Sequence, residues 1–169
     1  TGNDLNKLVI SILDMQKIQD HTLELIESSF KPLEDIVKLL NMYKAKAQLK
    51  NQLYSYLIDS SIPEILSGSP SRVLQVIEIV LDNAIKFTHT NGEININVVY
   101  DKFTKKLIVQ IQDNGVGIAK QDQECIYKLQ QLDATASRSH EGAGLGLNIA
   151  YNIMKLMKGN ISLKSIPNK

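Results

Sequence analysis

The sequence predicts an α+β fold: a two-layer α/β sandwich in which helices cover a mixed, mostly antiparallel sheet. Two neighbouring segments carry this prediction. Residues 71–88 place apolar side chains at helical spacing, so one face of that helix is buried. Residues 93–100 alternate apolar and polar side chains, as a half-buried strand does. A strongly amphipathic helix followed by such strands is typical of helices packed on one face of a sheet.

The composition excludes several classes of protein. The chain has 169 residues, 43% of them hydrophobic and 22% charged, with a net charge of +1, which suits one packed domain and neither a disordered tail nor a nucleic-acid-binding surface. The single cysteine, Cys125, cannot form an internal disulfide or hold zinc with other cysteines. No apolar run approaches the roughly 18 residues that span a membrane. We therefore expect a soluble cytoplasmic domain without nucleic-acid or membrane contact.

The first twenty residues form a helix by their pattern. Leu5, Leu8, Ile12 and Met15 follow an a/d seam about two heptads long. So short a seam rarely holds a dimer alone. The helix can equally pack on its own domain, or be the downstream end of a longer helical hairpin.

The remaining elements follow in order. A strand is expected at 21–30, then a helix opened by Lys31-Pro32 and running to about residue 48, because proline is favoured in the first turn. Strands are expected at 52–58, at 93–100 after a turn at Asn91-Gly92, and at 107–111. Residues 119–142 form a long polar loop with a short helical piece near 122–129, and such loops are usually functional. A helix over 145–158 ends at Gly159, and a last strand begins at Ile161.

Three segments carry chemistry. In the first, residues 82–88, Asn83 and Lys86 lie three apart on the polar face of the strong helix. An amide oxygen can ligate Mg²⁺, and a lysine can neutralise a phosphate. Taken alone, the segment also fits an ordinary solvated helix face.

The second and third segments are rich in glycine. Residues 113–118 (Asp-Asn-Gly-Val-Gly-Ile) follow a strand, where the glycines allow a ligand to approach and the aspartate can accept a hydrogen bond from the exocyclic amine of a base. Residues 142–147 (Gly-Ala-Gly-Leu-Gly-Leu) lead into a helix, whose free N–H groups attract an anion. A plain strand-end turn and a glycine-rich helix entry remain the alternatives for each segment alone.

Together and in this order, the three segments resemble the ATP-binding domain of sensor histidine kinases. That family shares its Bergerat (GHKL) fold with gyrase, Hsp90 and MutL proteins. Residues 72–88 resemble the family's N box, 113–118 its G1 box and 142–147 its G2 box, and residues 14–25 are similar to the junction between the dimerising hairpin and the ATP domain. The resemblance divides the chain into the C-terminal part of a dimerisation and phosphoacceptor hairpin (1–20) and an ATP-binding catalytic domain (21–169) that lacks its last strand.

The resemblance also implies roles for individual residues. Asn83 and Lys86 would be catalytic, with Asn83 ligating Mg²⁺ and Lys86 meeting phosphate. Asp113 would hold the adenine amine. The ATP lid would span 119–142, with Gln131, Asp133 and Arg138 in the family's pattern. The full set of residues expected to bind the ATP cofactor is Asn83, Lys86, Phe87, Asp113, Gly115, Gly117, Ile118, Arg138, Gly142, Gly144, Leu145, Gly146 and Leu147.

The sequence departs from the family at Ile79, where the N box usually carries a polar residue. At about 100° per residue, Ile79 lies about 40° from Asn83 and faces the same site, whereas Glu78 lies about 140° away. From this departure we expect weaker metal coordination or turnover. In the lid, Ile126 and Leu129 stand where the apolar anchors are usually aromatic.

The phosphoacceptor is the second departure. The family's acceptor histidine is followed by an acid and, a few residues later, by a proline. None of His21, His89 and His140 fits this pattern. We therefore expect the acceptor upstream of Thr1, so that these residues bind ATP without phosphorylating themselves.

The predicted function is thus a histidine kinase catalytic domain that transfers the γ-phosphate of ATP to an upstream histidine and then to a response-regulator receiver domain. The expected partners are ATP, that receiver domain and a second copy joined through the upstream hairpin. Two alternatives stay open: a catalytically impaired, nucleotide-binding regulatory module, and an ATPase or serine kinase of the same fold. The last is disfavoured because no carboxylate occupies position 79 to activate water.

Overall fold

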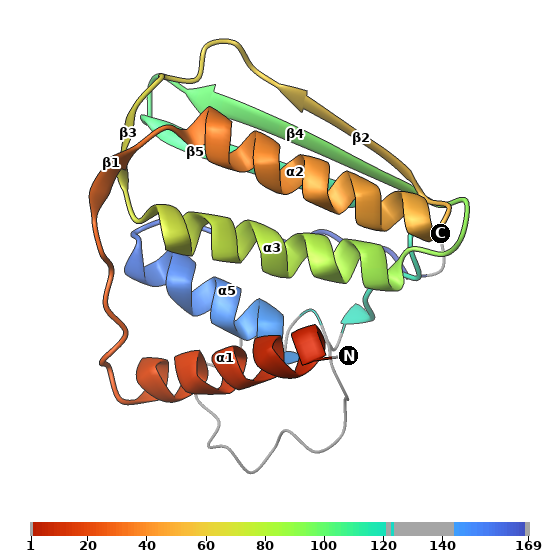
Figure 1. The fold of residues 1–169 in the computed structure, drawn as a ribbon, viewed down its shortest axis with the longest axis horizontal. Coiled ribbons are helices and arrows are strands. Elements are labelled where there is room, and N and C mark those ends of the chain that lie inside the picture. The colour runs from red at the N-terminus through yellow and green to blue at the C-terminus, as the bar shows by residue number, and fades with distance from the viewer. Residues whose placement is uncertain (1, 121–122, 124–143, 168–169) are drawn as a thin grey trace.

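The computed structural model describes residues 2–120, 123 and 144–167 (Figure 1). The helices of this part are α1 (Gly2–Gln19), α2 (Pro32–Leu49), α3 (Pro70–Phe87) and α5 (Gly144–Leu156). The strands are β1 (Ser28–Phe30), β2 (Leu53–Ile58), β3 (Leu66–Gly68), β4 (Glu93–Asp101) and β5 (Lys106–Asp113). No helix of the described part is long and apolar enough to cross a membrane.

The main sheet is mixed, as the sequence predicts. Its strand order is β2-β4-β5, with β2 parallel to β4 and β5 antiparallel to β4. In this register Ile94 lies opposite Asp113, so the beginning of β4 and the end of β5 lie side by side at the same end of the sheet. A separate antiparallel pair joins β1 to β3 over three residues each. The two-layer α+β prediction is confirmed.

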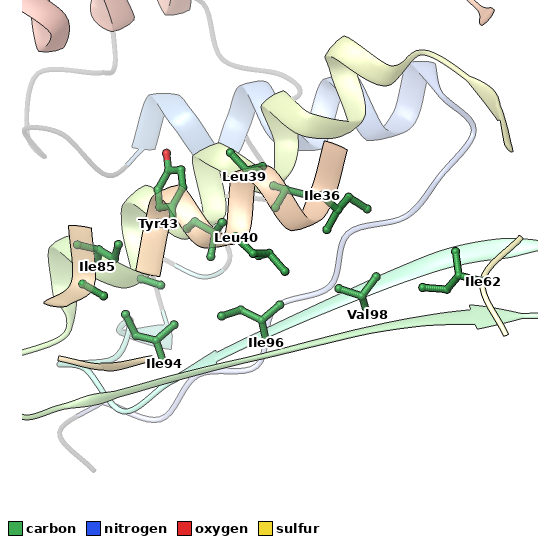
Figure 2. Close-up of a cluster of buried hydrophobic side chains, with 13 residues drawn as sticks. Ile36, Leu39, Leu40, Tyr43, Ile62, Ile85, Ile94, Ile96 and Val98 are labelled. Atoms are coloured by element: carbon green, nitrogen blue, oxygen red, sulfur yellow. The ribbon is translucent and has the colours of Figure 1, made fainter. Parts of the chain in front are cut away.

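The helices lie side by side in the order α2, α3, α5, α1 (Figure 1). α2 and α3 cover one face of the sheet, and the main core lies between them and β4. Figure 2 shows Leu40 of α2 directed toward Ile94 and Ile96 of the sheet, whereas the Tyr43 ring of the same cluster points away from the strands, and its hydroxyl bonds to the Glu78 carbonyl of α3. These side chains are almost fully buried. Burial of this apolar area, at about 25 cal/mol per Å², is the main force that holds the layers together.

A second apolar cluster joins α1, α3 and α5. Val76 of α3, Ile149 and Ile153 of α5, and Leu23 are buried in it, and Met15 of α1 packs against them. α1 therefore packs on the rest of the structure through α5, while part of its apolar surface, including Ile12, stays exposed.

Two predicted strands are corrected by the structure. Of residues 21–30 only Ser28–Phe30 form a strand, because β3 offers just three partners and Leu23 turns into the second cluster instead. The predicted strand beginning at Ile161 is absent from the described residues. In this segment the contact with residue 118 is made by a side chain and not by backbone strand pairing: Oγ of Ser165 accepts a hydrogen bond from the backbone N–H of Ile118 (2.8 Å). The helices at 1–20, 32–48, 71–88 and 145–158 are confirmed to within two residues. Most of the predicted lid lies outside the described residues.

A buried ion pair fixes α1 to the start of α3. The carboxylate of Asp14 accepts hydrogen bonds from Nη1 of Arg72 (3.1 Å to Oδ2) and from Nε2 of Gln75 (2.6 Å). The side chains of Asp14 and Arg72 are only 7% and 19% exposed. A buried pair of this kind contributes little net energy but enforces one geometry, because neither charge tolerates loss of the other.

Replacing Asp14 with alanine leaves Arg72 without its counter-charge. We expect Asp14→Ala to lower the free energy of unfolding by about 3 kcal/mol, measured by urea denaturation. Asp20→Ala, at an exposed aspartate just after α1, is the matched control and should change little. An Asp14→Ala variant as stable as this control would contradict the account.

Candidate functional site

The end of α3 meets the loop that follows β5. The carbonyl oxygen of Phe87, the last residue of α3, accepts a hydrogen bond from the backbone N–H of Val116 (3.3 Å). A Cβ atom on Gly115 would lie 2.5 Å from the same oxygen. Only glycine fits there, so this contact requires the residue that the sequence provides.

The loop after β5 is further fixed to β4. Oδ1 of Asn114 accepts a hydrogen bond from the backbone N–H of Glu93 (2.7 Å), and the Asn114 N–H donates to the Glu93 carbonyl (3.2 Å). Oδ1 of Asp113 accepts from the Gly115 N–H (2.9 Å). The Asp113 residue is nevertheless exposed, so its carboxylate is held by the loop and still accessible to a ligand.

The second glycine of this loop faces the C-terminal segment. Gly117 has φ +71°, a left-handed conformation that favours glycine, and a Cβ there would lie 2.4 Å from the carbonyl oxygen of Ile166. The next residue, Ile118, is bound by Ser165 as described above. Residues 117–118 are therefore held against residues 165–167.

α3 also contacts the first turn of α5. A Cβ on Gly146 would lie 3.2 Å from Cγ2 of Ile79, and Ile79 packs against the cluster that contains Ile149. Ile79 thus points toward α5, as its helical position predicts. Asn83 lies one helical turn further along α3, on nearly the same side.

Asn83, between these two contacts, is one of five described residues with a buried side-chain atom that lacks a hydrogen-bond partner. Its Nδ2 atom is buried and finds no hydrogen-bond partner among the described residues. A buried polar atom without a partner costs about 1–3 kcal/mol, so such an atom is expected where a ligand or water supplies the missing group. Lys86, three residues on, is exposed, and its Nζ lies 5.1 Å from the centroid of the Phe87 ring.

The opposite side of this part of α3 is anchored to α2. The Tyr43 hydroxyl donates to the Glu78 carbonyl (3.5 Å), and Nζ of Lys46 lies 3.6 Å from Oδ1 of Asp82 and 3.9 Å from the Tyr43 ring centroid. Burial raises the pKa of Tyr43 above its ordinary range, and the charge of Asp82 raises it further. Tyr43 therefore remains a neutral hydrogen-bond donor, and α3 is held on both sides.

These contacts bring two of the predicted segments onto α3: the loop after β5 through Phe87, and the first turn of α5 through Ile79. A carboxylate, a lysine, an unpaired amide and a helix N-terminus suit a ligand with a base at one end and phosphates at the other. No group of three or more His, Cys, Asp or Glu side chains in the described part could hold a metal ion. Arg138 and Gly142 lie outside the described residues.

Residues 68–169 match the family described as histidine kinase-, DNA gyrase B- and HSP90-like ATPases. The chain belongs to this family. The match spans all three boxes, and the resemblance to the catalytic ATP-binding domain of sensor histidine kinases is confirmed.

Individual relatives agree with this assignment. The histidine-protein kinase BarA of Escherichia coli (strain K12) is 32% identical over 173 residues, which cover 100% of this chain and 19% of BarA. The chain thus spans about a fifth of that relative's length. Full-length ShkA in complex with AMPPNP has a similar fold, with a TM-score of 0.74, 21% identity, and coverage of 93% of this chain and 32% of ShkA. ThkA in complex with the response regulator TrrA gives a TM-score of 0.66 at 22% identity, covering 94% and 43% of the two chains.

Sequence reasoning missed two residues that shape the site. Asn114 lies inside the second segment but joins β4 to β5, a role that only the register reveals. Gln52 donates hydrogen bonds to two carbonyls at the end of α3, whereas the sequence predicts only the first residue of a strand there. No local sequence pattern predicts that a side chain caps a helix end more than thirty residues away.

The contact between Gly115 and Phe87 can be tested by adding one methyl group. We expect Gly115→Ala to lower the free energy of unfolding by about 2 kcal/mol, because the methyl group meets a backbone carbonyl that cannot move aside. Urea unfolding measures this change.

Gly68→Ala is the matched control. There the nearest atom to an added Cβ is Cε1 of Phe30 at 3.7 Å, an ordinary contact. Equal effects of the two substitutions would show that the 115–116 loop is not packed against α3 as described.

Proposed function

We propose that this chain binds Mg²⁺-ATP at the C-terminal end of α3 and transfers the γ-phosphoryl group to a histidine outside these 169 residues, from which it passes to a response-regulator receiver domain. The observation that carries the proposal is the buried Nδ2 atom of Asn83, which has no hydrogen-bond partner within the described part of the chain. It lies between a glycine-rich loop on one side and the start of α5 on the other.

The residues take distinct roles at such a site. The exposed carboxylate of Asp113 accepts a hydrogen bond from the exocyclic amine of adenine, while Gly115 and Gly117 let the base approach the loop. Lys86 neutralises phosphate charge, and Phe87 flanks the nucleotide. The Asn83 amide oxygen would hold the cation, with the amide assigned in the orientation that suits this role.

The phosphate end of the nucleotide falls to α5. Its first N–H groups, from Gly144 to Gly146, have no partner within the helix and attract negative charge. Bound Mg²⁺ would supply charge neutralisation between the phosphate oxygens. The protein's own part is to position the groups, which is the larger share of catalysis in phosphoryl transfer.

The similar proteins support each part of this proposal. BarA is named a signal transduction histidine-protein kinase. ShkA was solved with AMPPNP, an ATP analogue, and ThkA with a response regulator. We extend these three properties to the present chain, together with dimerisation through a helical hairpin of which residues 1–20 form the end.

A second candidate is a regulatory module that binds the nucleotide without transferring phosphate. It is favoured by one observation: the Ile79 side chain packs against the α5 cluster and has no lone pair to offer a cation. If a second polar ligand at this position is needed for turnover, binding persists and transfer fails.

Nucleotide binding is tested most simply at Asp113. Asp113→Asn keeps the size of the side chain and an oxygen for the Gly115 N–H, but it removes the charged acceptor for adenine. We expect the affinity for Mg²⁺-AMPPNP, measured by calorimetry, to fall about tenfold or more. Asp101→Asn, at the other end of β4, should bind like the wild type. Equal affinity of the two variants would contradict the assigned role.

Phosphoryl transfer needs the acceptor. With labelled ATP, we expect no phosphohistidine on the 169 residues alone, and labelled protein once an acceptor-bearing helical hairpin is joined to the N-terminus. Asn83→Ala in the extended protein should abolish the label. Binding without label in the extended protein would instead support the regulatory module.

A further inference from the structure

The last turn of α3 is capped by a side chain from another element. Gln52 lies just before β2 and is only 4% exposed. Its Nε2 donates to the carbonyl of Ile85 (3.0 Å) and to the carbonyl of Thr88 (2.6 Å). Nζ of Lys50 also donates to Ile85 (3.0 Å). These bonds satisfy carbonyls that a helix end otherwise leaves unpaired.

The backbone around Gln52 is joined to the same region. The carbonyl of Asn51 accepts a hydrogen bond from Asn91 (2.8 Å), and the carbonyl of Gly92 accepts one from Leu53 (2.8 Å). Asn51 and Asn91 both adopt left-handed conformations, with φ of 54° and 64°. The loop between α2 and β2 is therefore bound directly to the loop between α3 and β4, and Gln52 has a fixed base.

The two carbonyls held by Gln52 lie on either side of Lys86 and Phe87. The carbonyl of Phe87 is left to the loop after β5, where it meets Val116 and Gly115. Because the peptide units at 85 and 88 are held, the backbone at Lys86 and Phe87 is held with them, and so are the direction in which the Lys86 side chain leaves the helix and that of the Phe87 carbonyl.

We propose that Gln52 is a positioning residue for nucleotide binding: buried beneath the site, it sets Lys86 and Phe87 in the orientation that receives the nucleotide. This inference rests on the proposed function. Gln52 touches no ligand itself, so its effect passes through Lys86 and the Phe87 contact.

The test measures binding of Mg²⁺-AMPPNP by calorimetry together with thermal unfolding. Gln52→Leu keeps a similar volume and removes both donated hydrogen bonds. We expect affinity to fall about tenfold while a single cooperative unfolding transition remains. Ile36→Val removes a methyl group from the core at the far end of α2, and as a control it should lower Tm and leave affinity unchanged.

A double-mutant cycle separates positioning from general loosening. If Gln52 acts through Lys86 as well as through the Phe87 contact, Gln52→Leu should reduce the affinity clearly less in the Lys86→Ala background than in the wild type, because one of the two positioned groups is gone. Fully multiplicative losses would overturn the proposal, as would wild-type affinity in Gln52→Leu.

Two other results also have a defined meaning: an unfolded Gln52→Leu variant, and a wild-type chain that does not bind AMPPNP. If Gln52→Leu does not fold, Lys50→Met removes one hydrogen bond to the same carbonyl from an exposed side chain: a loss of affinity of about twofold or more supports the proposal, and unchanged affinity overturns it. Failure of the wild-type chain to bind AMPPNP would instead refute the proposed function, whatever the variants do.

Discussion

The carbonyl oxygen of Phe87 is the point on which the site depends. Helix α3 must end there, because that oxygen serves the Val116 N–H instead of another helical turn. Gly115 must remain glycine, because any side chain would meet the same atom. The end of β5, and with it the exposed Asp113, is thereby set at a fixed distance from Lys86. One backbone group thus relates the base end of the proposed site to its phosphate end.

Contacts from several elements fix the position of α3 and prevent its rotation about its own axis. Tyr43 and Lys46 hold it from α2, Gln52 caps its last turn, and Ile79 packs it against α5. Asp14 ties its first turn to α1. Because α5 lies between α3 and α1, the helix that offers its N-terminus to phosphates also carries the contact with the N-terminal helix (Figure 1).

The sequence predicted the helices well, because an amphipathic stripe such as that of α3 reports its own burial. It also indicated the glycines at 115 and 117, because a glycine that allows close approach of two backbones can be seen directly in the sequence. For strands it did less well: it extended β1 too far, predicted a strand at Ile161 that the described residues lack, and missed β3. Leu23 and Ile161 look like strand residues locally, but a strand exists only if a partner is present, and β3 is too short to serve residues 21–27. Long-range polar contacts were out of reach: nothing near Gln52 indicates that its amide caps α3, and nothing near Asp14 indicates Arg72.

The most direct test of the account is hydrogen exchange of the chain with and without Mg²⁺-AMPPNP. A nucleotide seated at the end of α3 should slow exchange at residues 85–88, 113–118 and 144–147, and leave the exposed edge strand β2 unchanged. Protection confined to other elements, or none at saturating nucleotide, would show that the unpartnered amide of Asn83 and the glycine loops do not form a common site.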